Sequence, residues 1–313
     1  MSGEGSKSSG EIGEKIASKL LDKIGWKLSM HNVSIRCNTS THLNESNNQK
    51  KSHGEDQIFV YDDPFHDEVT EFVHVSVKNT KNPYPATQDA IKKKVKEDMD
   101  ELHEIIECAR YSEELSIIED QVNPKKYKKH SGLLVFLSNH IDELETSLRP
   151  SLANMRLNNS SSTPIYLIDN ARASFLLQVI DHLDKECSTT GKYEFYYPNL
   201  GTAVSVDTEP KGSYLPLGMI ASDLVVAIVQ KDKTKEMFLY SNDPFSDDSY
   251  KKLIGYGLSF SRGLIDTIKI GISNFNPTKD MEDATRIRLA FQDRNESVTP
   301  FSLRRSILDL VQE

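Results

Sequence analysis

Apolar residues recur at helical spacing near the start of the chain, between residues 11 and 28. The stripe consists of Ile12, Ile16, Leu20 and Ile24, with Ala17 and Leu21 beside it. This pattern predicts an amphipathic helix. At roughly 100° per residue, Glu14 falls at the edge of the stripe, where its carboxylate can point into a cleft. The helix dipole also favours an acidic residue near a helix start, so a purely local role for Glu14 is the alternative.

Two later segments, residues 56–61 and 72–78, alternate or carry β-branched side chains, which is typical of strands. The sequence between them is rich in Asp, Pro and His, which favours a turn. Together these features predict an antiparallel hairpin.

The hairpin would bring two charged residues together. If its turn centres near Asp67, Asp56 lies opposite Val77 or Lys78. In the second strand, Ser76 and Lys78 share one face. We therefore expect the carboxylate of Asp56 to lie near the ammonium group of Lys78. An ordinary salt bridge on an exposed strand face would use the same pair.

The rest of the chain alternates loops, helices and strands. Residues 38–52 are polar and predict a long loop, either functional or disordered. A long helix is expected over residues 86–120, followed by a boundary at Asn123-Pro124. Further on we expect strands at 133–137, 165–168, 224–229, 237–240 and 267–272, and helices at 176–183, 250–260 and 302–311. This alternation predicts an α/β protein, with a first domain over residues 1–125 and a second over residues 126–313.

Composition limits the classes of function. The chain has 313 residues, 37% of them apolar, and a net charge of −9. This acidity argues against general affinity for nucleic acid, so a nucleic-acid substrate must meet local basic patches. Lys92, Lys93 and Lys96 form one candidate patch, although such runs are commonly solvated faces.

Targeting and cysteine signals are weak. No apolar run approaches the roughly 18 to 20 residues that a membrane span needs, and residues 1–10 are polar, so we expect a cytoplasmic protein without a membrane partner. Cys37, Cys108 and Cys187 are far apart and lack the paired spacing of a zinc site or the even count of a disulfide framework. They are expected to be reduced thiols.

Metal-dependent phosphodiester hydrolysis needs a divalent cation held by carboxylates and a positive charge near the scissile phosphate. Asp56 can serve as a direct metal ligand and the backbone carbonyl of Val77 as a second ligand. Glu14 can reach the ion through water, and Lys78 can stabilise the attacking water or the developing charge. The expected ion is Mg²⁺ or Mn²⁺.

This arrangement over residues 11–110 resembles the PD-(D/E)xK, or restriction-endonuclease-like, nuclease superfamily. The Gly13-Glu14 helix start and the His53-Gly54-Glu55-Asp56 strand entry are similar to its Mrr-like and resolvase-like branches. The resemblance implies a restriction-endonuclease-like core and an endonuclease that cleaves DNA or RNA, including structured RNA such as tRNA. It also implies microbial anti-phage defence, with a homo-oligomer or a partner protein of a defence system supplying basic surface.

Ser76 departs from the superfamily pattern, which usually has Glu or Gln at this position. Serine is at best a weak metal ligand, so a catalytically inactive nuclease fold that binds nucleic acid or scaffolds a complex is the alternative. Glu55, Glu71 and His74 are nearby substitutes in the sequence. A second alternative is an α/β enzyme with its site at Asp169, although a helix-capping role fits that residue better.

Overall fold

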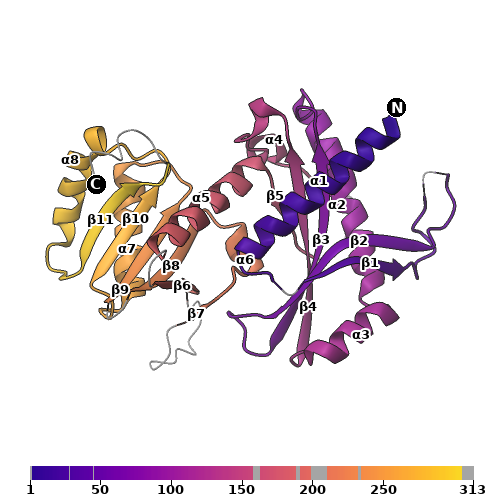
Figure 1. The fold of residues 1–313 in the computed structure, drawn as a ribbon, viewed down its shortest axis with the longest axis horizontal. Coiled ribbons are helices and arrows are strands. Elements are labelled where there is room, and N and C mark those ends of the chain that lie inside the picture. The colour runs from indigo at the N-terminus through magenta and orange to yellow at the C-terminus, as the bar shows by residue number, and fades with distance from the viewer. Residues whose placement is uncertain are drawn as a thin grey trace. The chain divides into compact units, whose positions relative to one another are not determined.

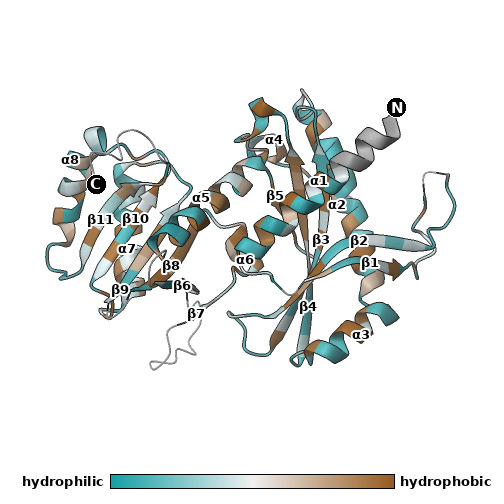
Figure 2. Ribbon diagram, in the orientation of Figure 1, coloured by the Kyte–Doolittle hydropathy of each residue, from teal (hydrophilic) through white to brown (hydrophobic). Residues whose placement is uncertain are grey.

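The chain forms two compact units, Met1–Ser174 and Phe175–Glu313, each built around a mixed β-sheet (Figure 1). The computed structural model describes residues 2–27, 29–44, 46–157, 163–187, 191–198, 210–231 and 234–304, with side chains from residue 10 onward. Hydrophobic residues gather along the strands, while the helices alternate hydrophobic and polar positions (Figure 2). In these parts of the chain, no helix combines the length and the hydrophobicity that crossing a bilayer requires.

The first unit contains a five-stranded sheet with the order β1-β2-β3-β4-β5. Neighbours are antiparallel from β1 to β3 and parallel from β3 to β5. Its elements are α1 (Ser2–Lys23), β1 (Met30–Arg36), β2 (Ser52–Asp62), β3 (Val69–Thr80), α2 (Gln88–Ala109), α3 (Glu113–Val122), β4 (Tyr127–Ser138), η1 (Ile141–Glu143), α4 (Arg149–Leu152) and β5 (Ile165–Ile168), followed by the start of α5 (Asn170–Glu186).

The second unit contains a six-stranded sheet with the order β11-β10-β9-β8-β6-β7. β9, β10 and β11 are parallel to one another, and the other pairs are antiparallel. The elements are β6 (Lys192–Tyr196), β7 (Lys211–Gly212), α6 (Leu217–Ile220), β8 (Leu224–Lys231), β9 (Thr234–Ser241), α7 (Asp247–Ser261), β10 (Thr267–Ile272), α8 (Pro277–Arg288), η2 (Leu289–Phe291) and β11 (Ser297–Ser302). The α/β class expected from the sequence is therefore confirmed.

The division of the chain differs from the expected boundary near residue 125. β4 pairs with β3 along its whole length, from Tyr127 to Ser138, and β5 pairs with β4. The first sheet is incomplete without these two strands, so the first compact unit extends to Ser174. Most of the expected helix at 302–311 lies outside the described residues. Residues 302–304 form the end of β11 and the bend after it.

Two details of the local predictions were wrong. The expected helix over 86–120 is two helices, because the side chain of Ser112 accepts a hydrogen bond from the backbone of Leu115 and starts α3. The expected stripe on α1 is also shifted. Ile12 and Ile16 are exposed, whereas Ala17 and the later apolar residues are buried.

The β2–β3 hairpin is confirmed, but its register differs from the expected one. Asp62 lies opposite Thr70, so the turn centres on His66 instead of Asp67. Within the turn, the carboxylate of Asp63 accepts a hydrogen bond from the backbone of Phe65 and contacts the ring of His66. This side-chain capping fixes the turn one residue earlier than its sequence pattern indicated.

Helices α1 and α2 cover opposite faces of the first sheet. α2 packs on Leu134 and Phe136 of β4, which pair with Ser76 and Lys78 of β3. α1 instead lies against Asn79 of β3, the position after Lys78. Since successive side chains of a strand alternate between faces, the central strands β3 and β4 are enclosed on both sides.

Candidate active site

Asp56 lies where the ladder between β2 and β3 ends. Its Oδ2 atom accepts a hydrogen bond of 2.6 Å from the backbone N–H of Val77. The last main-chain pair before this point is Gln57 opposite Val75, so Asp56 continues the register opposite Ser76. The carboxylate thus replaces a main-chain acceptor at the point where the strands separate, one residue from the expected position.

The side chains of β2 change their alternation around Asp56. Glu55 bonds His74, and Ile58, which pairs with His74, packs on the same face of the sheet. In a regular strand only residues separated by an even number of positions share a face, but Glu55 and Ile58 are an odd number of positions apart. β1 is irregular at the matching position, because Asn32, opposite Asp56, has a left-handed φ of 54°. The register of β1 and β2 is the same on both sides of this position, so no residue is inserted, and we interpret the feature as a local irregularity of the ladder that re-aims the side chains. Asp56 is thereby turned away from the face that holds Glu55 and toward α1.

Lys78 lies near the end of β3, and its Nζ atom donates a hydrogen bond of 2.7 Å to Glu101 of α2. Burial disfavours the ammonium form, but the hydrogen bond and charge of Glu101, followed by the charges of Asp98 and Asp56, raise the pKa of Lys78 above its ordinary value. Although burial opposes ionisation of Glu101, the same bond holds the pKa of that carboxyl below its ordinary value. Lys78 is therefore a fixed positive charge at neutral pH and not a general base.

Glu14 projects from α1 beside this group. The helix approaches the end of β3 closely, because Gly13 lies against Asn79, the residue after Lys78. Burial and then the charge of Asp56 raise the pKa of Glu14. Burial also raises the pKa of Asp56, against the opposing effects of the Val77 hydrogen bond and Lys78. The structure thus places Glu14 within electrostatic reach of Asp56, and Asp56 within electrostatic reach of Lys78.

Ser76 is buried, and none of the acids or bases near it in the sequence replaces the missing glutamate. Glu55 and His74 form a fully buried pair 2.7 Å apart. Glu71 accepts hydrogen bonds from Tyr61 and Ser131. These residues are committed to the interior of the sheet and do not face the Asp56 carboxylate.

The sequence interpretation missed Glu101, the acidic partner of Lys78. Lys94, Asp98 and Glu101 follow one another at spacings of four and three, which places them on one face of α2. Oδ1 of Asp98 accepts a hydrogen bond from Lys94, whereas the buried Oδ2 has no hydrogen-bond partner. The helical spacing was visible in the sequence, but only the fold shows that this face meets Lys78.

A pocket of about 340 Å³ opens beside Lys78. Lys94 lines it, together with Tyr84 and the Pro83–Pro85 segment. Of the lysines expected to contact nucleic acid, Lys93 is exposed and Lys92 and Lys96 are half-exposed. At helical spacing, Lys92 and Lys96 lie about half a turn away from Lys94, so the run surrounds the helix and only its third lysine borders the pocket.

The donor set fits a hard divalent cation. Asp56 and Glu14 provide two carboxylates, and the peptide unit of Val77 adjoins them. Mg²⁺ and Mn²⁺ favour carboxylate, carbonyl and water oxygens. Burial, and to a smaller extent nearby acidic charge, raises the pKa of both carboxyl groups, and a bound cation would favour their ionised forms.

The second segment considered as a site, around Asp169, has structural partners. Its carboxylate accepts hydrogen bonds from the backbone of Leu148 and of Arg172, in the first turn of α5. The adjacent Asn170 bonds Tyr84 and the backbone of Ser138. These contacts agree with the helix-capping role and join α5 to the first sheet.

The mixed sheet, its flanking helices and these charged residues define a restriction-endonuclease-like core. A family model described as the GAPS4 protein PD-(D/E)XK nuclease domain matches residues 1–172. The chain belongs to this family, and the match ends two residues before the first compact unit does. The superfamily expected from the sequence is confirmed. No curated protein and no solved structure matched the chain.

Proposed function

We propose that this chain is a divalent-metal-dependent endonuclease that hydrolyses phosphodiester bonds in nucleic acid. The observation that carries the proposal is the convergence of Glu14, Asp56, Lys78 and Glu101 from four separate elements. The carboxylates of Glu101 and Asp56 act on the protonated Lys78, which lines a pocket, and Glu14 acts on Asp56. The nuclease family supports the same reaction.

Each residue has a role that follows from its position. Asp56, Glu14 and the carbonyl group of Val77 would hold Mg²⁺ or Mn²⁺, which when bound would polarise the phosphate and lower the pKa of a water ligand. Lys78 donates hydrogen bonds to a phosphate oxygen and stabilises the charge that develops there. Glu101 holds the Lys78 ammonium group in place and supplies the negative charge that Ser76 does not.

The substrate contacts the surface beside Lys78 and Lys94, which border the pocket. Lys92, Lys93 and Lys96 lie around the rest of α2 and add positive charge nearby. Because the whole chain carries a net charge of −9, binding depends on this local patch and on basic surface from a second copy or a partner protein.

The proposed setting is anti-phage defence in the cytoplasm of a microbial cell. GAPS4, the name of the matched family, denotes a defence system. The family match ends before the second unit, so we assign that unit to recognition, regulation or assembly. Light scattering on the purified chain, alone and with proteins encoded beside it, tests the assembly. Phage plating on cells that express the wild type or Lys78→Met tests the defence role.

The nuclease activity is tested by incubating the purified chain with duplex DNA, single-stranded DNA and tRNA in Mg²⁺, Mn²⁺ or EDTA. We expect cleavage that EDTA abolishes and that Asp56→Asn and Lys78→Met each reduce by about 100-fold or more, since one such electrostatic contact is worth that much in a desolvated site. The matched controls Glu68→Gln and Lys252→Met change exposed residues and should cleave as the wild type does. Full activity in both site variants contradicts the assignment.

A catalytically inactive nucleic-acid-binding or scaffold protein is the second candidate, because Ser76 replaces the usual acid. This second function predicts that the chain binds these substrates but cleaves none of them with any of the metal ions. It also predicts that Lys78→Met weakens retention of nucleic acid without changing its length. Gel-shift and cleavage measurements on the same samples therefore separate the two functions.

A further inference from the structure

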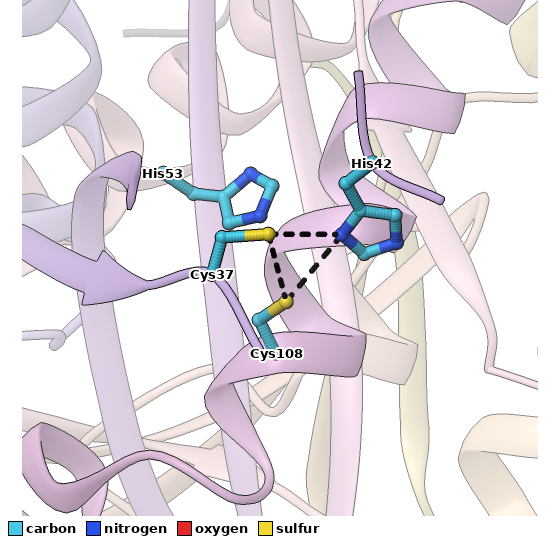
Figure 3. A group of neighbouring side chains, drawn as sticks. All are labelled: Cys37, His42, His53 and Cys108. Atoms are coloured by element: carbon cyan, nitrogen blue, oxygen red, sulfur yellow. Dashed lines mark hydrogen bonds between the residues drawn. The ribbon is translucent and has the colours of Figure 1, made fainter. Parts of the chain in front are cut away.

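Two cysteines and two histidines that are distant in the sequence meet in the interior of the first unit. Cys37 follows β1, His42 lies in the connection to β2, His53 lies in β2 and Cys108 lies near the end of α2. All four side chains are buried, and one ligand atom from each lies within 4.8 Å of the others. The two sulfur atoms and the Nδ1 atom of His42 face one another, with the His53 ring beside them (Figure 3).

The separations match those between the ligands of a tetrahedral zinc ion. Zn–S bonds of about 2.3 Å and Zn–N bonds of about 2.0 to 2.1 Å imply about 3.8 Å between two sulfurs and about 3.6 Å between sulfur and nitrogen. The Sγ atoms of Cys37 and Cys108 are 3.9 Å apart. Nδ1 of His42 lies 3.7 Å from the first sulfur and 3.4 Å from the second.

The environment of the histidines independently points to a ligand. Nε2 of His53 is buried among these groups without a hydrogen-bond partner, which is costly for a polar atom in the interior. Nε2 of His42 lies 3.4 Å from the carboxylate of Glu107. A carboxylate behind the second ring nitrogen is the usual support of a metal-bound histidine, because it fixes the tautomer that leaves the other nitrogen free to coordinate.

Two other arrangements explain less. A core of reduced thiols leaves the buried Nε2 of His53 unsatisfied. A disulfide between Cys37 and Cys108 would need the sulfurs to approach from 3.9 Å to about 2.05 Å. It would also leave the two buried imidazoles without a metal ion to coordinate.

We propose that Cys37, His42, His53 and Cys108 bind one structural Zn²⁺ ion. Two thiolates and two imidazoles in tetrahedral arrangement select zinc among the common divalent ions. With four protein ligands the coordination shell is closed, as in structural and not catalytic zinc sites. The site is separate from the carboxylates that would hold Mg²⁺, and it stands whether or not the chain cleaves nucleic acid.

The location of this site gives it a consequence for the nuclease core. His53 precedes Asp56 by three positions in β2, and Cys108 follows Glu101 by seven in α2. The ion therefore ties the strand that carries Asp56 to the helix that carries Glu101. Through His42, the ion also anchors the polar connection over residues 38–52. The sequence pattern predicts that this loop is either functional or disordered.

The test is the zinc content of the full chain, purified under reducing conditions without chelator and measured by plasma mass spectrometry. We expect about one zinc per chain. Cys37→Ser, His53→Asn and Cys108→Ser should each lower that content at least tenfold after equal dialysis. Cys187→Ser and Asp56→Ala, which change residues outside the cluster, should retain it.

X-ray absorption spectroscopy on the wild type tests the zinc site even if the variants fail to fold. We expect two sulfur neighbours at about 2.3 Å and two nitrogen neighbours at about 2.0 to 2.1 Å. A zinc-free wild type with three titratable thiols, a Cys37–Cys108 disulfide found by peptide mapping, or a zinc shell without sulfur would each overturn the proposal.

Discussion

Single residues determine the geometry of the proposed active site. Asp56 follows Glu55 in the sequence, yet the Asp56 carboxylate bonds the backbone of Val77 at the proposed site, whereas the Glu55 carboxylate forms a buried pair with His74. Lys78 is held by Glu101, a residue from a different element. The proposed site therefore includes an acid that the superfamily motif does not contain.

The role of Glu101 can be tested by Glu101→Gln. We expect cleavage to fall about tenfold or more, because the amide no longer fixes or neutralises the Lys78 ammonium group. Initial cleavage rates over a Mg²⁺ titration measure the effect. Glu97→Gln, an exposed position on the same helix, is the matched control. Equal rates for both variants and the wild type would show that Glu101 is only a surface partner of Lys78.

At the scale of elements, the packing of α1 against β3 places Glu14. The helix ends where Gly25, with φ of 99°, allows Trp26 to bond back to Leu21, and Trp26 then stacks on Phe59 at 4.5 Å. Midway along the helix, the absence of a side chain at Gly13 permits close contact with β3. The small residue is thus as important for the position of Glu14 as the apolar stripe.

Two glycines of α1 provide a matched pair of substitutions. In Gly13→Ala, the new Cβ would lie 2.2 Å from Cβ of Asn79, so the helix must shift. We expect a loss of about 1 to 3 kcal/mol in the free energy of unfolding and a large loss of cleavage. In Gly10→Ala nothing lies within 4 Å of the new Cβ, and helix propensity should add about 0.5 to 1 kcal/mol. Urea unfolding compares them, and equal stability of both variants contradicts the packing argument.

At the scale of the whole molecule, the two units have separate sheets and separate stabilising contacts. In the second unit, His182 of α5 stacks on Phe301 and contacts the hydroxyl group of Tyr240 at 2.9 Å. Burial, partly offset by Glu186, lowers the pKa of His182 to about 4. This neutral histidine makes the stability of the unit sensitive to acid.

The direction of the pH effect follows from proton binding. Above pH 6.5 the folded and unfolded chains both hold a neutral His182, so its contribution to stability is complete. Between about pH 6.5 and 4 only the unfolded chain gains the proton, and the free energy of unfolding falls by up to about 3 kcal/mol. His182→Gln removes this titration. Denaturant unfolding of both chains across this pH range should show a steeper loss for the wild type, and parallel curves would refute the prediction.

By itself the sequence determined the properties that depend on local spacing. The apolar period of α1, the alternation in β2 and β3 and the turn between them predict Glu14, Asp56 and Lys78 as site residues, which stays a prediction, and indicate the nuclease superfamily, which is confirmed. The strands expected at 133–137 and 165–168 are also present, within β4 and β5. These features are encoded over a few consecutive residues, where side-chain period and turn chemistry act directly.

Tertiary structure alone decided the contacts between distant segments. Glu101 meets Lys78, and Cys108 meets Cys37, across 23 and 71 positions of the chain. The change of alternation at Asp56 lies where the ladder between β2 and β3 ends and opposite Asn32 of β1. A sequence pattern states which residues share a face of a helix or strand, but which faces meet depends on how all the elements bury their apolar surfaces together.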